Sequence, residues 1–125
     1  MADFIPHDRF EALLADESIP VVHRALWLLL WDSEVRVLDL LALDVADEPR
    51  VRPPADSAHG ARAAELMDAL IAGRASGPLF AVGPRALSWV EAVRVAGEHG
   101  HQVHSFRTSG RQHRGRVGAP PACGG

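Results

Sequence analysis

The chain has 125 residues, a formal net charge of −3 and 47% hydrophobic residues, which suits one domain with a modest core. No apolar run reaches the roughly 18 residues of a membrane span, and the acidic, amphipathic N-terminus is unlike a secretory signal. The single cysteine, Cys123, excludes an internal disulfide and favours a cytoplasmic protein. Because lysine and tyrosine are absent, neither an amine nor a phenol side chain is available for chemistry.

Helical spacing of apolar residues predicts a first helix over residues 6–15 and a second over residues 20–31. The segment WDSE then interrupts the apolar run, and a third, short helix is expected over residues 35–43. The stretch 45–60 contains three prolines and has room for one short strand near residues 50–52.

In the second half, a helix is expected over residues 61–72, followed by a turn, a brief extended piece and another turn. The next predicted helix spans residues 84–96, with Ala86, Trp89, Val90 and Val93 facing inward. A last short helix is expected over residues 102–112. We interpret residues 1–113 as the folded domain and residues 114–125, which lack periodicity, as a disordered Gly/Pro/Arg tail.

Arg36 stands at the beginning of the short leucine-rich helix. A buried guanidinium without a partner is costly, so this side chain must be paired or directed at a ligand. Asp39, one turn later, is the obvious local partner. One interpretation is a structural Arg36–Asp39 ion pair at the edge of the core, and the other is an anion-binding arginine held by that aspartate.

His104 and Arg107 are three residues apart and share a face of the last predicted helix. A planar guanidinium beside an imidazole suits a phosphate oxygen, although the same spacing also occurs by chance on helix surfaces. His99, His101 and His104 are also clustered, and a His-x-His pair can chelate zinc. Glu98 is the only acidic residue near these histidines, and no further ligand completes the set, so we predict no metal site. We also predict no cofactor.

The charge is distributed unevenly along the chain. Residues 1–98 hold nine arginines and sixteen acidic residues, whereas residues 99–125 hold four arginines and no acid. Basic segments of this kind often contact nucleic-acid phosphate, and a solvated tail is the alternative. The DNA-binding candidates in this segment are Arg111, Arg114 and Arg116.

Two motifs, in this order along the chain, resemble the catalytic domain of tyrosine recombinases, the phage-integrase family. They are EVRVLDLLALDV and, downstream, VHSFRTS. Arg36 matches the first catalytic arginine and Asp39 the acidic residue one turn later. His104 and Arg107 match the family's HxxR motif, and His113 matches a histidine often found six residues after that arginine. The resemblance covers residues 4–113. It implies a mainly α fold, namely a compact helical core of that domain type with a much reduced β-hairpin. It also implies an activity, strand exchange at a DNA phosphodiester.

The chain departs from the family where the chemistry is done. The nucleophilic tyrosine and the hairpin lysine are absent, and Thr108 stands where the family usually has a histidine. The resemblance therefore implies a truncated core that binds double-stranded DNA in recombination or integration and lacks independent strand cleavage. We do not expect Cys123, Ser105, Thr108 or Ser109 to replace the tyrosine, although a complete recombinase could supply one in trans.

Two other interpretations stay open at this point. An incomplete core would expose apolar surface, around Leu28, Trp31 and Trp89, through which the chain would bind a full-length recombinase or a second copy of itself. The chain would then be a non-enzymatic interaction module without a membrane partner. The other interpretation is a decayed integrase fragment.

Overall fold

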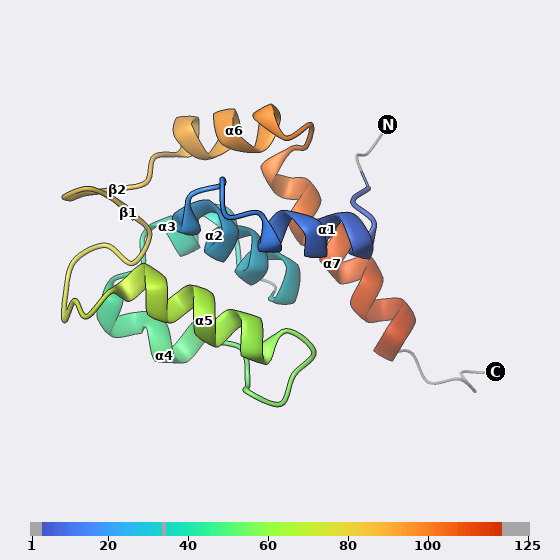
Figure 1. The fold of residues 1–125 in the computed structure, drawn as a ribbon, viewed down its shortest axis with the longest axis horizontal. Helices are drawn as coiled ribbons and strands as arrows, with labels where there is room; N and C mark the ends of the chain where they lie inside the picture. Colours follow the sequence, from blue (N-terminus) through green and yellow to red (C-terminus); the bar gives the residue numbers. More distant parts are fainter. Residues whose placement is uncertain (1–3, 34, 119–125) are drawn as a thin grey trace.

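The computed structural model describes residues 4–33 and 35–118, and this part of the chain is mainly α-helical, as predicted (Figure 1). No helix within it has the length and apolar character needed to cross a bilayer. The elements in chain order are α1 (His7–Ala15), α2 (Val21–Asp32), α3 (Val37–Leu41), a 3-10 turn η1 (Val45–Asp47), α4 (Glu48–Val51), α5 (Gly60–Ile71), strands β1 (Ala81–Val82) and β2 (Arg85–Ala86), α6 (Trp89–Glu98) and α7 (Val103–Gly118).

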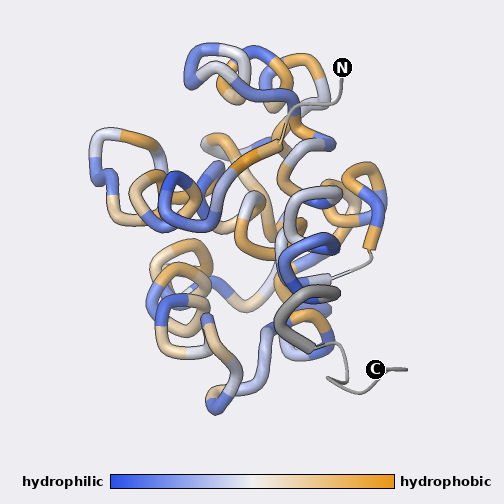
Figure 2. The backbone as a smooth tube through the Cα atoms, turned by 90° about the vertical axis from the view of Figure 1, so that its right-hand side faces the viewer, coloured by the Kyte–Doolittle hydropathy of each residue, from blue (hydrophilic) through white to orange (hydrophobic). Residues whose placement is uncertain are grey.

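Helix α2 lies at the centre of the core, and α7, α5 and α1 pack around it (Figure 1). The tube coloured by hydropathy shows apolar and polar residues alternating along the helices (Figure 2), and residues 25–31 of α2 are all buried. Two stacked aromatic pairs fix the contacts: Trp31 lies on Phe10 with ring centroids 3.9 Å apart, and Trp27 lies on Phe106 at 4.7 Å. The prediction that Leu28 and Trp31 are uncovered is therefore wrong, because α7 and α1 cover the helix that carries them.

Helices α2 and α7 approach each other closely at Gly110. A Cβ atom at this position would lie 2.6 Å from the Cα atom of Trp31 and would also clash with the Trp31 carbonyl oxygen. One turn later, the guanidinium of Arg114 donates to that same carbonyl. Helix α7 continues to Gly118, beyond residue 112, where the last helix was predicted to end. Residues 119–125 lie outside the described residues.

The segment after α3 differs from its prediction. The expected strand near residues 50–52 is instead the short helix α4, with Pro49 in its first turn, where a missing N–H costs nothing. Glu48 is buried and is paired with Arg52, which also donates to Asp68 Oδ1 at 2.8 Å. This i,i+4 pair stabilises a helical turn and ties it to α5.

Helix α6 presents a different face to the core from the one predicted. Residues 81–86 form a two-stranded antiparallel hairpin, and Ser88 then begins the helix, accepting a hydrogen bond from Glu91 N at 3.1 Å. Ala92, Val95 and Ala96 are buried, whereas the four residues predicted to face inward, Ala86, Trp89, Val90 and Val93, are exposed. The apolar face of this helix is broad and extends over more than half of its circumference, so the spacing alone did not fix which part of it packs on the core.

Candidate functional site

The arginine hollow, as we call it, lies between the start of α3, the start of α6 and α7. It has a volume of about 580 Å³. Arg36, His104 and Arg107, the three residues predicted to bind phosphate, all line it although they come from distant parts of the sequence. The full lining consists of Arg36, Val37, Leu38, Asp39, Trp89, His104 and Arg107.

Arg36 does not form the predicted structural ion pair with Asp39. No ion pair or hydrogen bond joins the two side chains in the described part of the chain. Arg36 is the residue before α3, its backbone is extended, and its side chain is exposed. The argument for pairing assumed a buried guanidinium, and a hydrated one needs no protein partner. The other interpretation, an arginine available to an anion, is compatible with this position.

The α7 wall of the arginine hollow is held by the core. Val103 and Phe106 are buried, so His104 and Arg107 are presented together on the neighbouring face of the helix. His104 is exposed and Arg107 is half-buried. The ring of Trp89 lies 5.8 Å from that of His104 and forms part of the apolar wall. Two guanidinium groups and an imidazole thus border a hollow large enough for an anion.

The remaining predicted residues are not gathered there. His113 and Arg114 line a second hollow of about 420 Å³ beside the end of α2, and Arg111 is exposed on α7. Ser105 and Ser109 are buried, and Ser109 Oγ accepts a hydrogen bond from Ile5 N at 2.8 Å. Thr108 donates to the His104 carbonyl at 3.2 Å. The side chain of Arg116 and all of Cys123 lie outside the described residues.

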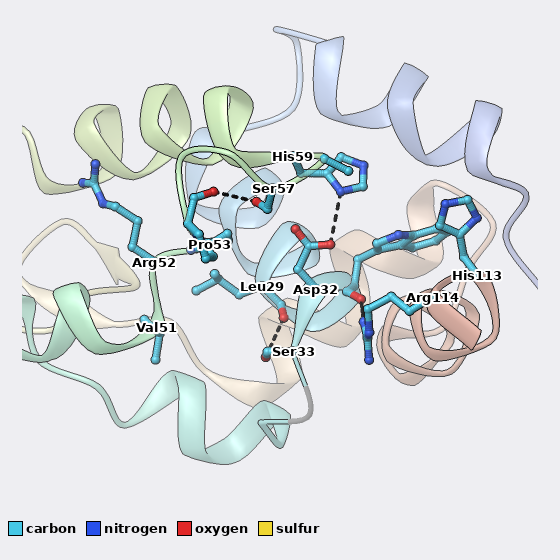
Figure 3. Close-up of a pocket in the computed structure, with 13 residues that line it drawn as sticks. Leu29, Asp32, Ser33, Val51, Arg52, Pro53, Ser57, His59, His113 and Arg114 are labelled. Carbon is cyan, nitrogen blue, oxygen red and sulfur yellow. Dashed lines mark hydrogen bonds and ion pairs between the residues drawn. The ribbon is translucent and has the colours of Figure 1, made fainter. Parts of the chain in front are cut away.

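A second polar group, the histidine cluster, was not predicted. It consists of His7 and Glu11 on α1, Asp32 at the end of α2, and His59 just before α5. The buried His59 ring places Nδ1 3.1 Å from Asp32 Oδ1, and Figure 3 shows these two side chains pointing toward each other. His59 Nε2 lies 3.0 Å from Glu11 Oε2 and 3.3 Å from His7 Nε2.

The hydrogen bond with Asp32 raises the pKa of His59 above its ordinary value, against the lowering effect of burial. The negative charges of Asp32 and Glu11 act in the same direction as the hydrogen bond. The His7 ring also stacks in parallel on His113, with centroids 4.5 Å apart. The histidine cluster therefore connects α1, α2 and the start of α5, and its His7 ring contacts α7.

Sequence reasoning missed this cluster because its members are 27, 48 and 52 residues apart along the chain. The one local signal was the i,i+4 spacing of His7 and Glu11. His7, Glu11 and His59 are the one group with metal-ligand geometry found among the described residues. The alternative set considered from the sequence, His99, His101 and His104, does not form such a group there.

Comparisons with protein-family models, with curated proteins and with solved structures find no match to this chain. No relative therefore assigns a role to either the arginine hollow or the histidine cluster. Both are interpreted from the chemistry and placement of their own side chains.

Proposed function

We propose that this chain binds the phosphate backbone of double-stranded DNA in the arginine hollow, as a tyrosine-recombinase-like protein in DNA recombination or integration. The observation that carries the proposal is that Arg36, His104 and Arg107 line one hollow. The resemblance assigns these same three residues to a scissile phosphate. The proposal concerns binding, because the chain contains no tyrosine to attack phosphorus and no lysine to protonate the leaving group.

The chemistry of the lining suits a phosphate. Each guanidinium offers a planar fork of donors that matches two phosphate oxygens, and His104 adds a third donor from a neighbouring turn. Contacts of this kind position a duplex and contribute affinity, but they read little sequence. Asp39 opposes them, since its carboxylate lines the same hollow and repels an anion.

The test is fluorescence anisotropy with a labelled duplex across a salt series. Removing Arg36 and Arg107 together should weaken binding at least about tenfold and reduce the salt slope by about two, one for each lost phosphate contact. The matched control, Arg50→Ala/Arg85→Ala, removes the same charge from exposed side chains outside the hollow. Equal losses in the two double variants would mean diffuse charge attraction, and the proposed site would be abandoned.

A carboxylate variant tests the same site from the opposite direction. Asp39→Asn removes a negative charge from the arginine hollow, so it should tighten DNA binding. Asp56→Asn removes an equal charge from an exposed loop residue and should change the affinity less. If the two variants behave alike, the phosphate does not sit beside Asp39.

A second candidate function is docking onto a full-length recombinase or onto another copy of this chain. Val90 and Leu38 are 75% and 65% exposed, and Trp89 and Val93 are also exposed on α6. Exposed apolar side chains of this number favour a protein contact. Sedimentation velocity of the wild type against Val90→Glu tests self-association: a concentration-dependent dimer that the substitution abolishes supports it, and a wild-type monomer throughout contradicts it.

A further inference from the structure

The histidine cluster brings three ligand-type atoms to one point. His7 and Glu11 share a face of α1, and their Nε2 and Oε2 atoms lie 3.2 Å apart. His59 Nε2 is 3.0 Å from the same Glu11 oxygen and 3.3 Å from His7 Nε2. The three atoms therefore form a nearly equilateral triangle whose edges are all close to 3 Å.

These edges match those of a tetrahedral metal site. With metal–ligand bonds of about 2.0–2.1 Å, two ligands of a tetrahedral zinc ion are about 3.3 Å apart. One small cation above the triangle would therefore reach all three atoms at bonding distance. Two imidazoles and one carboxylate are also a ligand set that zinc uses in proteins.

The hydrogen bond to Asp32 prepares His59 for this role. A neutral imidazole that donates from Nδ1 to Asp32 carries its lone pair on Nε2. In that tautomer the lone pair faces the Glu11 oxygen, so two acceptors meet at 3.0 Å, and a cation between them, either a proton or a metal ion, removes their repulsion. A proton on His59 would satisfy one such contact, whereas a metal ion would satisfy His7, Glu11 and His59 together. A carboxylate behind a ligating histidine is the usual way in which proteins orient that ligand.

We propose that His7, Glu11 and His59 bind a divalent transition-metal ion of the zinc class, with Asp32 as the residue that orients His59. The three ligands occupy one face of the ion and leave a fourth position for water or an anion. The side chains of His7 and Glu11 are 37% and 40% exposed, so this position is reachable from solvent. Sites with three protein ligands and one open position are typical of reactive rather than purely structural zinc.

The site does not depend on the DNA-binding proposal. None of His7, Glu11, Asp32 and His59 lines the arginine hollow. The metal-ligating residues come from α1 and the start of α5, and the orienting carboxylate comes from the end of α2. A failure of either proposal would leave the other unaffected.

The test is isothermal titration of the metal-free full chain with zinc chloride, supported by the visible absorption of the cobalt(II)-loaded protein, which reports tetrahedral coordination. The Cys123→Ser variant serves as the background so that the thiol contributes no ligand. We expect one zinc per chain. His7→Gln and Glu11→Gln should each lower the affinity at least about 100-fold, and Asp32→Asn should lower it about 10–100-fold, the usual effect of losing an orienting partner.

The matched control is His99→Gln/His101→Gln, which removes the His-x-His pair of the sequence and should leave zinc binding unchanged. His7 and Glu11 are partly exposed on a surface helix, so their glutamine variants should fold, and circular dichroism verifies this. The proposal is overturned if the wild type shows no saturable zinc binding, which would make the cluster a proton-sharing hydrogen-bond network. It is equally overturned if His7→Gln and Glu11→Gln keep full affinity, or if the control variant loses it.

Discussion

Replacing Gly110 by alanine should destabilise the protein, although alanine is the better helix former. The added Cβ would lie 2.6 Å from the Trp31 Cα atom and 2.7 Å from its carbonyl carbon, and ordinary contact begins at 3.4 Å. Backbone atoms cannot rotate away, so α7 must move away from α2. Overpacking of this kind costs about 1–3 kcal/mol, and the gain in helix propensity returns at most about 1 kcal/mol. Because the clash is with backbone atoms, the cost lies at the upper end of that range, and we expect a net loss of about 2 kcal/mol.

Urea unfolding followed by circular dichroism measures this change, and Gly97→Ala is the matched control. Gly97 also lies inside a helix, α6, but a Cβ there would meet nothing within 4 Å. That substitution should leave the stability unchanged or raise it by up to about 1 kcal/mol. If Gly110→Ala is as stable as the wild type, then α2 and α7 do not touch through their backbones and the described packing is wrong.

Two further predictions concern buried charge. Arg52→Met leaves the carboxylate of Glu48, which is 7% exposed, without its partner and should cost about 1–3 kcal/mol in thermal or urea unfolding. Arg50→Met removes a side chain that is itself 82% exposed and should have little effect. Burial lowers the pKa of His23 in the folded protein. As the pH falls below about 6.5, His23 therefore takes up a proton in the unfolded chain before it does so in the folded one. The free energy of unfolding that His23 contributes at neutral pH is lost on acidification. The variant His23→Leu should therefore gain stability relative to the wild type between pH 7 and 5, and parallel pH profiles would contradict this. The opposite contribution of His59 is common to both proteins and cancels in the comparison.

The sequence predicts best the helices whose apolar residues follow one clear stripe. A helix was expected over residues 61–72, and its apolar residues at helical spacing, Ala63, Leu66, Met67 and Leu70, are all buried in α5. In α6 the apolar face covers more than half of the circumference, and Glu91, Arg94 and Glu98 occupy the rest, so more than one part of that face could have turned to the core. The choice was made by the hairpin and the Ser88 cap, which fix where α6 begins, and by the small side chains of Ala92 and Ala96, which allow close packing.

The two sites differ in how visible they are from sequence. Arg36 and the His104–Arg107 pair could be predicted together because an ordered pair of motifs implied their meeting. The pairing of Arg36 with Asp39 was wrong because the argument depended on burial, which a local pattern does not reveal. The histidine cluster has no such pattern, since His59 meets Asp32 and Glu11 only when α1, α2 and α5 pack together.

The end of α2 is the structural link between the two sites. The Trp31 carbonyl accepts from Arg114 and lies against Gly110 on α7, while the next residue, Asp32, orients His59 on the other side. Displacing α7 through Gly110→Ala should move His104 and Arg107 away from α3 and weaken DNA binding. The proposed zinc ligands lie on α1 and at the start of α5, and the His7 ring contacts α7 through His113, so the same variant should lose less zinc affinity than DNA affinity. A variant that loses both together would indicate general unfolding, whereas selective loss of DNA binding would identify the α2–α7 contact as the element that sets the width of the arginine hollow.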